Sequence, residues 1–272
     1  MARLGKTNYT HIIEGIELSQ IRAQMNILIT GGTGTIGQAL IKKLLENSTN
    51  HIFVTTRNVG RAKKRLGNQV NFAFSPTEFD FNNLDVVINL AGEPIADKRW
   101  TTAQKEAICQ SRWQMTATLT ELINQADHPP HTFISGSAIG IYGRQTEPAI
   151  SEDFSNFHPE FSHAICSKWE QLALNVSATK TRVCLLRTGI VLCQDGGALR
   201  KMLPAFKFGL GGPLASGQQI MSWIDIEDMV SAIIFIINTA TLSGPINMTA
   251  PNPVTNKQFT RELAKTLHRP AV

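Results

Sequence analysis

Clustered cysteines and long hydrophobic runs are both missing from this 272-residue sequence. No apolar stretch reaches the ~18 residues that a membrane-spanning helix requires, so we expect no contact with a membrane. The longest candidate, from Met229 to Ile237, has the pattern of a buried amphipathic helix. No Cys-x-x-Cys pair is present, which argues against a structural metal site and favours a reducing, cytoplasmic location. The four cysteines are Cys109, Cys166, Cys184 and Cys193.

A strong charge of one sign is also missing. The chain has 26 lysines and arginines against 21 aspartates and glutamates, which gives a net charge of +5. The basic residues are scattered except over residues 61–65, where we expect a solvated helix face. No nucleic-acid-binding motif accompanies them, so we expect no nucleic-acid partner. A hydrophobic content of 42% suits one large α/β domain, or a core with a small second lobe.

Residues 1–24 differ from the rest of the chain. They are polar, contain no apolar core of a signal peptide, and end just before Met25, where an apolar run begins. We interpret them as an extension without ordered structure and assign them no function.

From Met25 onward, short apolar runs alternate with amphipathic helical patterns. This alternation predicts an α/β fold, a doubly wound parallel sheet of the Rossmann type, over residues 25–187. Residues 188–272 are expected to form a small C-terminal lobe. The predicted strands cover residues 26–30, 51–56, 70–74, 85–90, 131–135 and 182–187, and the main predicted helices cover 36–46, 102–125 and 161–177.

The sequence pattern changes in the C-terminal part, residues 188–272. Residues 188–225 are rich in glycine and show no regular period, so we expect loops and short elements over a cleft. A helix is predicted to start near Asp225, which suits a helix cap, with Asp228 in its first turn. Another is predicted from Thr255, because Gln258 completes a capping-box pattern.

A glycine-rich segment, residues 31–37, separates the first predicted strand from the first predicted helix. Glycines at 31, 34 and 37 permit a tight turn, close approach of a diphosphate, and packing of the helix on the sheet. An ordinary glycine turn is the alternative, but the strand–loop–helix context favours a nicotinamide-dinucleotide site at the helix N-terminus. Its predicted binding residues are Gly31, Thr33, Gly34, Thr35, Ile36 and Gly37.

The end of the second strand indicates which dinucleotide binds. NAD sites usually place Asp or Glu there, whereas this sequence has Arg57. Because a guanidinium forms charge-assisted hydrogen bonds with phosphate, we predict NADP, with NAD less favoured. Arg57 could also be a surface arginine without a ligand. The small residues that close the fourth strand, Leu90, Ala91 and Gly92, are predicted to line the cofactor cleft.

Several motifs together resemble the short-chain dehydrogenase/reductase superfamily, in its extended branch of sugar-nucleotide epimerases. The similarity is greatest to an atypical group of nucleoside-diphosphate-sugar epimerases, of the NAD-dependent epimerase/dehydratase type. It implies a small-molecule substrate such as a nucleotide sugar, bound by a lobe at residues 188–272. The chain ends before the C-terminal tail typical of that group, so we expect this lobe to lack it. The motifs are residues 29–37, 89–94, 111–112, 134–143, 163–170, 187–189 and 222–228.

The superfamily's chemistry, as the resemblance implies, uses a serine, a tyrosine and a lysine. The serine orients the substrate oxygen, the tyrosine transfers its proton, and the lysine binds the nicotinamide ribose and lowers the tyrosine pKa. Ser137 matches the serine, with Ser135 as its neighbour, and Lys168 matches the lysine. Ala164 stands in the tyrosine's place, so the usual proton donor is missing.

Four side chains are candidates to replace the missing tyrosine as proton donor. Helical periodicity places Lys168 and Cys166 on the two edges of an apolar stripe, and His163 nearly opposite it, facing solvent unless residues 188–225 cover it. We rank Tyr142 and Lys168 above Cys166, with His163 last. A packing or surface role is the alternative for each. The predicted catalytic residues are Ser137, Tyr142 and Lys168.

Two functions stay open at this point. One is an NADP-dependent epimerase or oxidoreductase acting on a nucleotide-sugar-like or other carbonyl substrate by hydride transfer. The other is an NADP(H)-sensing regulatory protein without turnover, which the missing tyrosine favours. Arg112 and Arg187 could face phosphates, although a solvated helix face or a strand end explains them equally well. The sequence predicts neither the natural substrate nor the oligomeric state.

Overall fold

A seven-stranded parallel sheet forms the centre of the protein, in a computed structural model that describes residues 24–145, 149–177 and 179–271. The N-terminal extension proposed from the sequence therefore lies outside the described residues, apart from Gln24. The strand order is β10-β6-β5-β4-β1-β2-β3, and every neighbouring pair is parallel. The strands are β1 (Asn26–Thr30), β2 (His51–Thr55), β3 (Val70–Ala73), β4 (Val86–Asn89), β5 (Thr132–Ala138), β6 (Arg182–Thr188) and β10 (Gly244–Met248).

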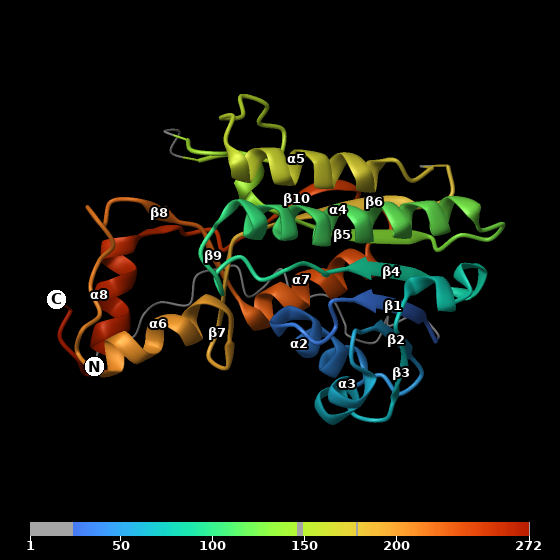
Figure 1. Cartoon of the computed structure of the whole chain (residues 1–272), viewed down its shortest axis with the longest axis horizontal. Coiled ribbons are helices and arrows are strands. Elements are labelled where there is room, and N and C mark those ends of the chain that lie inside the picture. Colours follow the sequence, from blue (N-terminus) through green and yellow to red (C-terminus); the bar gives the residue numbers. More distant parts are fainter. Residues whose placement is uncertain (1–23, 146–148, 178, 272) are drawn as a thin grey trace.

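Helices cover both faces of this sheet (Figure 1). On one face, Ile27 and Ile29 of β1 share a core cluster with Leu40 of α2 and Ile233 of α7. On the other face, Leu28 shares a cluster with residues of α4 and α5. Successive side chains of β1 thus enter opposite layers, as the strand pleat requires. The helices are α2 (Thr35–Leu44), α3 (Val59–Leu66), α4 (Thr102–Gln125), α5 (Phe161–Leu174) and α7 (Ile226–Asn238).

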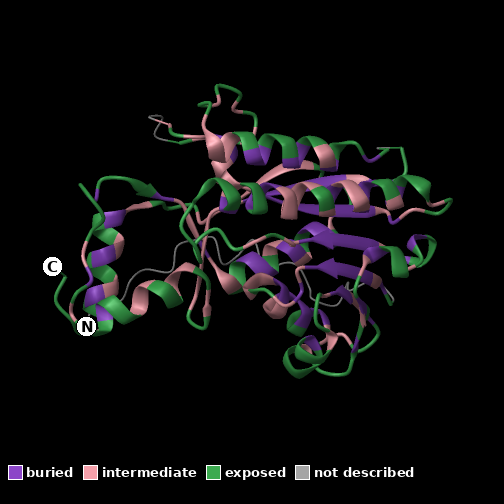
Figure 2. Ribbon diagram, viewed as in Figure 1, coloured by how far each residue is buried: buried purple, intermediate pink, exposed green. Residues whose placement is uncertain are grey.

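The strand order confirms the doubly wound fold that the alternation predicted. From β1 the chain adds β2 and β3 on one side, and then β4, β5 and β6 on the other. The order therefore reverses between β1 and β4, and in such sheets ligands bind beyond the carboxyl ends of the strands at this point. Figure 2 shows that the buried residues concentrate on the central strands and on the inward faces of the helices.

The elements that follow β6, other than α7 and β10, form a group toward the left of Figure 1. Within it, β7 pairs with β9 in parallel, and β8 pairs with β11 in antiparallel orientation. Its elements are β7 (Ile190–Cys193), α6 (Gly197–Lys207), β8 (Ile220–Met221), β9 (Trp223–Asp225), β11 (Val254–Thr255) and α8 (Asn256–Thr266).

Two helix starts in the C-terminal part are confirmed. The Asp225 side chain accepts a hydrogen bond from the Glu227 amide at 2.7 Å and caps α7. Thr255 and Gln258 form the predicted capping box of α8.

The expectation that residues 188–225 consist of loops and short elements was wrong at α6. This helix runs for eleven residues, carries Pro204 in its interior, and starts after an extended Gly196. Its apolar residues Leu199, Met202, Leu203 and Phe206 do follow a helical period, but the glycines before it and the internal Pro204 obscured the helix in the sequence. Among the described residues, no helix is long and apolar enough to cross a membrane.

Candidate functional site

The glycine-rich loop makes a tight turn between β1 and α2. Gly31 has φ +73°, and a Cβ there would lie 2.4 Å from the Leu90 carbonyl oxygen. A Cβ on Gly37 would lie 2.5 Å from the Gly31 carbonyl oxygen, so helix and loop touch backbone to backbone. No side chain caps α2 at Gly34, which is exposed. The helix N-terminus therefore faces the sheet edge with its N–H groups available to an anion.

Hydrogen bonds fix this loop beside the end of β4. Thr30 Oγ1 donates to Asn89 Oδ1 at 2.7 Å, and Asn89 Nδ2 donates to Thr116 Oγ1 of α4 at 2.8 Å. Asn89 and Thr116 are fully buried, so these bonds are shielded from water. The predicted turn Leu90–Ala91–Gly92 thus lies next to the glycine loop.

Arg57 is exposed just beyond the end of β2. Its charge reaches the β4 turn: Lys98 chiefly, and Arg57 to a smaller extent, lower the pKa of the Glu93 carboxyl. Arg65 of α3 donates to the carbonyl oxygen of Thr33 at 3.4 Å. Positive side chains therefore border the loop on the β2 side.

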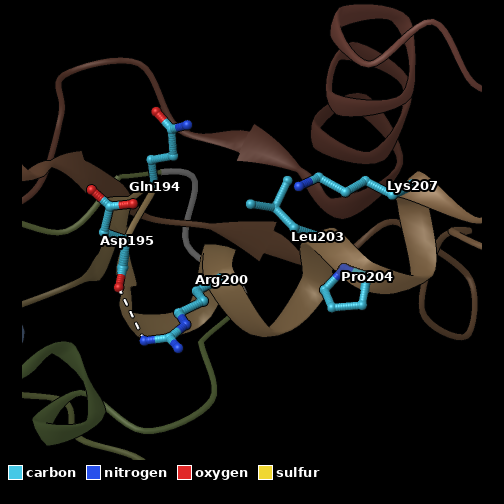
Figure 3. Close-up of a pocket in the computed structure, with 6 residues that line it drawn as sticks. All are labelled: Gln194, Asp195, Arg200, Leu203, Pro204 and Lys207. Carbon is cyan, nitrogen blue, oxygen red and sulfur yellow. Dashed lines mark hydrogen bonds between the residues drawn. The ribbon is translucent and has the colours of Figure 1, made fainter.

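Two hollows lie near the edge of the sheet that is formed by the carboxyl ends of its strands. One of about 320 Å³ is bounded by residues 74–76 after β3 and by α4 side chains that include Gln114 and Met115. The other, of about 520 Å³, lies between the turn before α6 and α6 itself, and Figure 3 shows Arg200 bonded there to the carbonyl oxygen of Asp195. The adjoining Gly196 is so close to α2 that a Cβ would lie 2.5 Å from Thr35 Oγ1.

Ser137, the predicted serine, lies buried near the carboxyl end of β5. Its hydroxyl donates to Glu170 Oε1 of α5 at 2.6 Å. Arg187 at the end of β6 holds the same carboxylate from two nitrogens, with Nε to Oε1 and Nη2 to Oε2 both at 3.0 Å. Serine, carboxylate and guanidinium therefore form one buried polar unit.

Tyr142 belongs to the same unit. Arg187 Nη1 lies 3.0 Å from the Tyr142 hydroxyl, which donates to Asn247 Oδ1 of β10 at 2.7 Å. Burial alone would lower the pKa of Arg187, but hydrogen bonds and charge attraction from Glu170 and Tyr142 raise it overall. A fixed cation thus contacts the phenol oxygen of Tyr142.

Lys168 lies outside this unit. It is exposed on α5, with its ammonium 4.2 Å from the centre of the Trp113 ring. Its predicted catalytic role has no contact with Ser137 or Tyr142 to support it. Ala164 is exposed as well, so neither position of the superfamily's tyrosine–lysine pair faces the buried unit.

The two lower-ranked candidates are held in packing contacts. Burial, and then the negative charge of Glu170, raise the pKa of Cys166 to about 12, so its thiol stays neutral. His163 is half-buried rather than solvent-facing: its ring stacks on Phe157, and Nδ1 lies 2.6 Å from the Ile141 carbonyl oxygen. The segment that covers it precedes α5, and it is not the 188–225 segment considered from the sequence.

Sequence reasoning missed Glu170 and Asn247. Glu170 lay within a recognised motif, four residues after Cys166 and next to Trp169, and it is buried with both. A carboxylate at that spacing on a buried helix face is a signal for an ion pair. Asn247 had no signal, because β10 was not predicted. Among the described residues, no group of three metal-ligating side chains is present.

Comparison with known proteins agrees with this geometry. The family model described as the NAD-dependent epimerase/dehydratase family matches residues 27–248. A Staphylococcus aureus epimerase family protein is 38% identical over 244 residues, which cover 89% of this chain and 81% of that protein. A Staphylococcus haemolyticus relative is 37% identical over 243 residues. The chain therefore belongs to the NAD-dependent epimerase/dehydratase family.

Solved structures agree on the fold. The human epimerase family protein SDR39U1, determined with NADPH, superposes with a TM-score of 0.81 at 29% identity, over 91% of this chain and 81% of that one. A nucleoside-diphosphate sugar epimerase from Corynebacterium glutamicum superposes with a TM-score of 0.71 at 29% identity, over 92% of this chain and 52% of that one. A UDP-glucuronic acid 4-epimerase from Bacillus cereus, determined with UDP-glucuronic acid and NAD, has a TM-score of 0.78 at 20% identity, over 91% of this chain and 85% of that one.

Proposed function

We propose that this protein is an NADP-dependent epimerase or oxidoreductase that acts on a nucleotide-sugar-like or other carbonyl substrate. The observation that carries the proposal is the glycine loop, whose turn and uncapped helix N-terminus lie at the point where the strand order reverses. A cytoplasmic location, favoured by four free cysteines, is part of the proposal.

The residues present fit a nicotinamide dinucleotide. A Cβ at Gly31 or Gly37 would collide with backbone, and no side chain competes for the N–H groups at the start of α2. Those groups would hold the diphosphate, with Leu90, Ala91 and Gly92 alongside. Arg57 would meet the additional phosphate that distinguishes NADP from NAD. The hollow of about 320 Å³, lined by Phe74, Pro76 and Met115 and by polar side chains of α4, would take the adenine ring.

The bound cofactor would supply or accept the hydride. Ser137 gives its only hydroxyl hydrogen to Glu170, which leaves its lone pairs free to accept a hydrogen bond from a substrate hydroxyl. Tyr142 carries a second hydroxyl, with the Arg187 cation 3.0 Å from its oxygen. We infer that Ser137 orients the substrate oxygen and that Tyr142, rather than Lys168, is the proton donor, a role that requires its hydroxyl to exchange Asn247 for the substrate.

A regulatory protein that binds NADP(H) without turnover is the second candidate. The exposed positions of Ala164 and Lys168 favour it, because the superfamily's proton donor has no equivalent there. Both functions require the same cofactor loop, so they differ only in catalysis.

Titration of the protein with NADPH and NADH, followed by ligand fluorescence, tests the cofactor. Absorbance of NADPH against a panel of keto sugars and simple carbonyl compounds then tests net reduction. Chromatography of nucleotide sugars incubated with the protein and NADP tests epimerisation, which consumes no cofactor. Tight NADPH binding with turnover of one panel class supports the enzyme. Binding without turnover across the panel supports the sensor, and failure of either dinucleotide to bind at millimolar concentration contradicts both.

A further inference from the structure

Residues 194–207, which comprise the turn before α6 and α6 itself, contact two segments of the predicted cofactor site. A Cβ on Gly196 would lie 2.5 Å from Oγ1 of Thr35, so this turn touches the start of α2. Lys201 of α6 forms an ion pair with Asp97, in the segment that follows the turn after β4. We call residues 194–207 the strap, because they join the helix that begins at the glycine loop to the segment beyond β4.

The turn of the strap borders the predicted position of the cofactor diphosphate. Thr35 is the first residue of α2, and its neighbours Gly34 and Ile36 are also predicted to bind the cofactor. The N–H groups at this helix start would hold the diphosphate. Because Gly196 lies against Thr35, the turn that precedes α6 in Figure 3 would lie directly beside that group. Exit of the cofactor past this turn then requires the strap to move.

The strap is weakly attached to the rest of the protein. Phe206 is the one buried residue of α6, and this helix packs chiefly on β7, whose residues are half-buried. Lys201 and Asp97 are 45% and 50% exposed, and ion pairs in water contribute little stability. Gly197 and Gly209, at φ +62° and +72°, flank α6 in conformations that glycine adopts readily. Segments with few buried contacts open locally at a low cost in free energy.

We propose that the strap closes over the bound cofactor and opens to admit and release it, with the Asp97–Lys201 pair as its latch. The proposal rests on the proposed function, because it takes the ligand of the glycine loop to be NADPH. Local opening then limits both association and dissociation of the cofactor. Weakening the latch should raise both rates, whereas the dissociation constant should change less than either rate. Loss of a direct cofactor contact would instead raise the dissociation rate alone.

Stopped-flow fluorescence of NADPH measures both rates, with excess NADP to displace the bound NADPH. Asp97→Asn should raise each rate by about twofold to fivefold, the factor expected of an exposed ion pair. Lys201→Gln should have the same effect, and combining the two changes should add nothing further, because either one removes the pair. The matched control is Glu46→Gln, which removes an ion pair with Lys43 of similar exposure, 46% and 59%. This control should leave both rates unchanged.

Gly196 provides a second way to open the strap. Its φ is −157°, an extended conformation that any residue adopts, so a side chain there acts only through contact. The Cβ of Gly196→Val would collide with Thr35, and we expect both rates to rise by about tenfold or more. In the charge-reversed double variant, Asp97→Lys with Lys201→Asp, the ion pair forms again and the rates of the unmodified protein should return.

Cys193 reports opening of the strap without any cofactor. It directly precedes the strap, forms a β-bridge with Gly196, and is half-buried, whereas the other three cysteines are buried. In the unliganded protein, Asp97→Asn and Gly196→Val should accelerate the reaction of Cys193 with a thiol reagent, and NADPH should slow it. Cys193→Ser identifies the signal, since the rapid phase of labelling should be missing from this variant.

The outcomes separate this proposal from the proposed function. Unchanged rates and unchanged Cys193 labelling in Asp97→Asn and Gly196→Val would overturn the strap, even if NADPH binds tightly. A higher dissociation rate with an unaltered association rate would also overturn it, since that result marks a cofactor contact rather than a cover. If NADPH does not bind at all, the proposed function fails, and Cys193 labelling of the unliganded protein still decides whether the Asp97–Lys201 pair holds the strap closed.

Discussion

Arg187 binds the Glu170 carboxylate through two parallel hydrogen bonds, both 3.0 Å long, in the interior between β6 and α5. Both side chains are less than a tenth exposed, so neither charge is well screened by water. Ser137 of β5 also donates to Glu170, at Oε1, and Arg187 Nη1 donates to the Tyr142 hydroxyl. The pair therefore joins the elements on which the predicted serine and tyrosine are carried.

Removing one member of this pair should destabilise the fold. We expect Arg187→Met to lower the free energy of unfolding by about 3–5 kcal/mol, because it leaves the Glu170 carboxylate buried without its partner. Urea denaturation measures the change. In the matched control, Arg261→Met removes an exposed arginine paired with Glu262, where the loss should be about 0–1 kcal/mol. Equal losses in both variants would mean that the buried pair stabilises the fold no more than an exposed pair does.

Gly34→Asp should abolish dinucleotide binding. A carboxylate at this exposed position would stand at the N-terminus of α2, where it would occupy the anion site and repel a diphosphate. The affinity for NADPH, measured by calorimetry, is the readout. Ser231→Asp, which adds the same charge on the exposed side of α7, is the control. Retained affinity in Gly34→Asp would exclude the glycine loop as the phosphate site.

Arg57→Glu should weaken NADP much more than NAD. A charge-assisted hydrogen bond contributes about 1.5–3 kcal/mol, so we expect a loss of about tenfold to a hundredfold for NADP. NAD lacks the additional phosphate and should lose little. Fluorescence titrations with NADPH and NADH provide the comparison, and equal losses for the two would remove the argument for NADP.

Cys166 should make the protein less stable at alkaline pH. Burial raises its pKa to about 12 in the folded state, above the ordinary thiol value of 9.0. Between pH 9 and pH 12 the thiol ionises in the unfolded chain but not in the folded one. The free energy of unfolding is therefore unaffected by Cys166 below pH 9 and falls above it, by about 1.4 kcal/mol per pH unit.

Comparison with Cys166→Ala isolates the pH dependence of stability that Cys166 causes. Denaturant unfolding between pH 9 and pH 11 should show a steeper decline of stability for the unmodified protein than for the variant. Labelling with a thiol reagent gives a second test, because folded Cys166 should react only after unfolding. Parallel pH profiles, or rapid labelling at pH 8, would contradict the assignment.

The sequence predicted the central sheet well for a physical reason. Strands buried on both faces have short continuous apolar runs, and β1 and β4 have such runs. β10 was not predicted, because it begins with Gly244 and Pro245 and is only partly buried. α6 was missed for a different reason, because Gly196 and Gly197 before it and Pro204 within it are typical of loops, although its apolar residues follow a helical period.

The candidate site was predictable only where it depends on local sequence. The glycine loop is one continuous segment between a strand and a helix, so its position follows from the pattern. The contact of Ser137 with Glu170 joins residues 33 positions apart, and that of Tyr142 with Asn247 joins residues 105 positions apart. Such contacts depend on how strands and helices assemble. Lys168 illustrates the limit, because helical periodicity placed it beside the stripe and the structure has it on the Trp113 ring.

The position of β10 at the edge of the sheet has a consequence for synthesis of the chain. Asn247 is among the last quarter of residues to emerge from the ribosome, yet it accepts the hydrogen of the Tyr142 hydroxyl and donates its backbone N–H to Glu152 Oε1. The glycine loop, by contrast, is made near the beginning. A nascent chain can therefore shape its phosphate loop long before the tyrosine hydroxyl obtains its final partner, and truncation before residue 244 would separate the two events permanently.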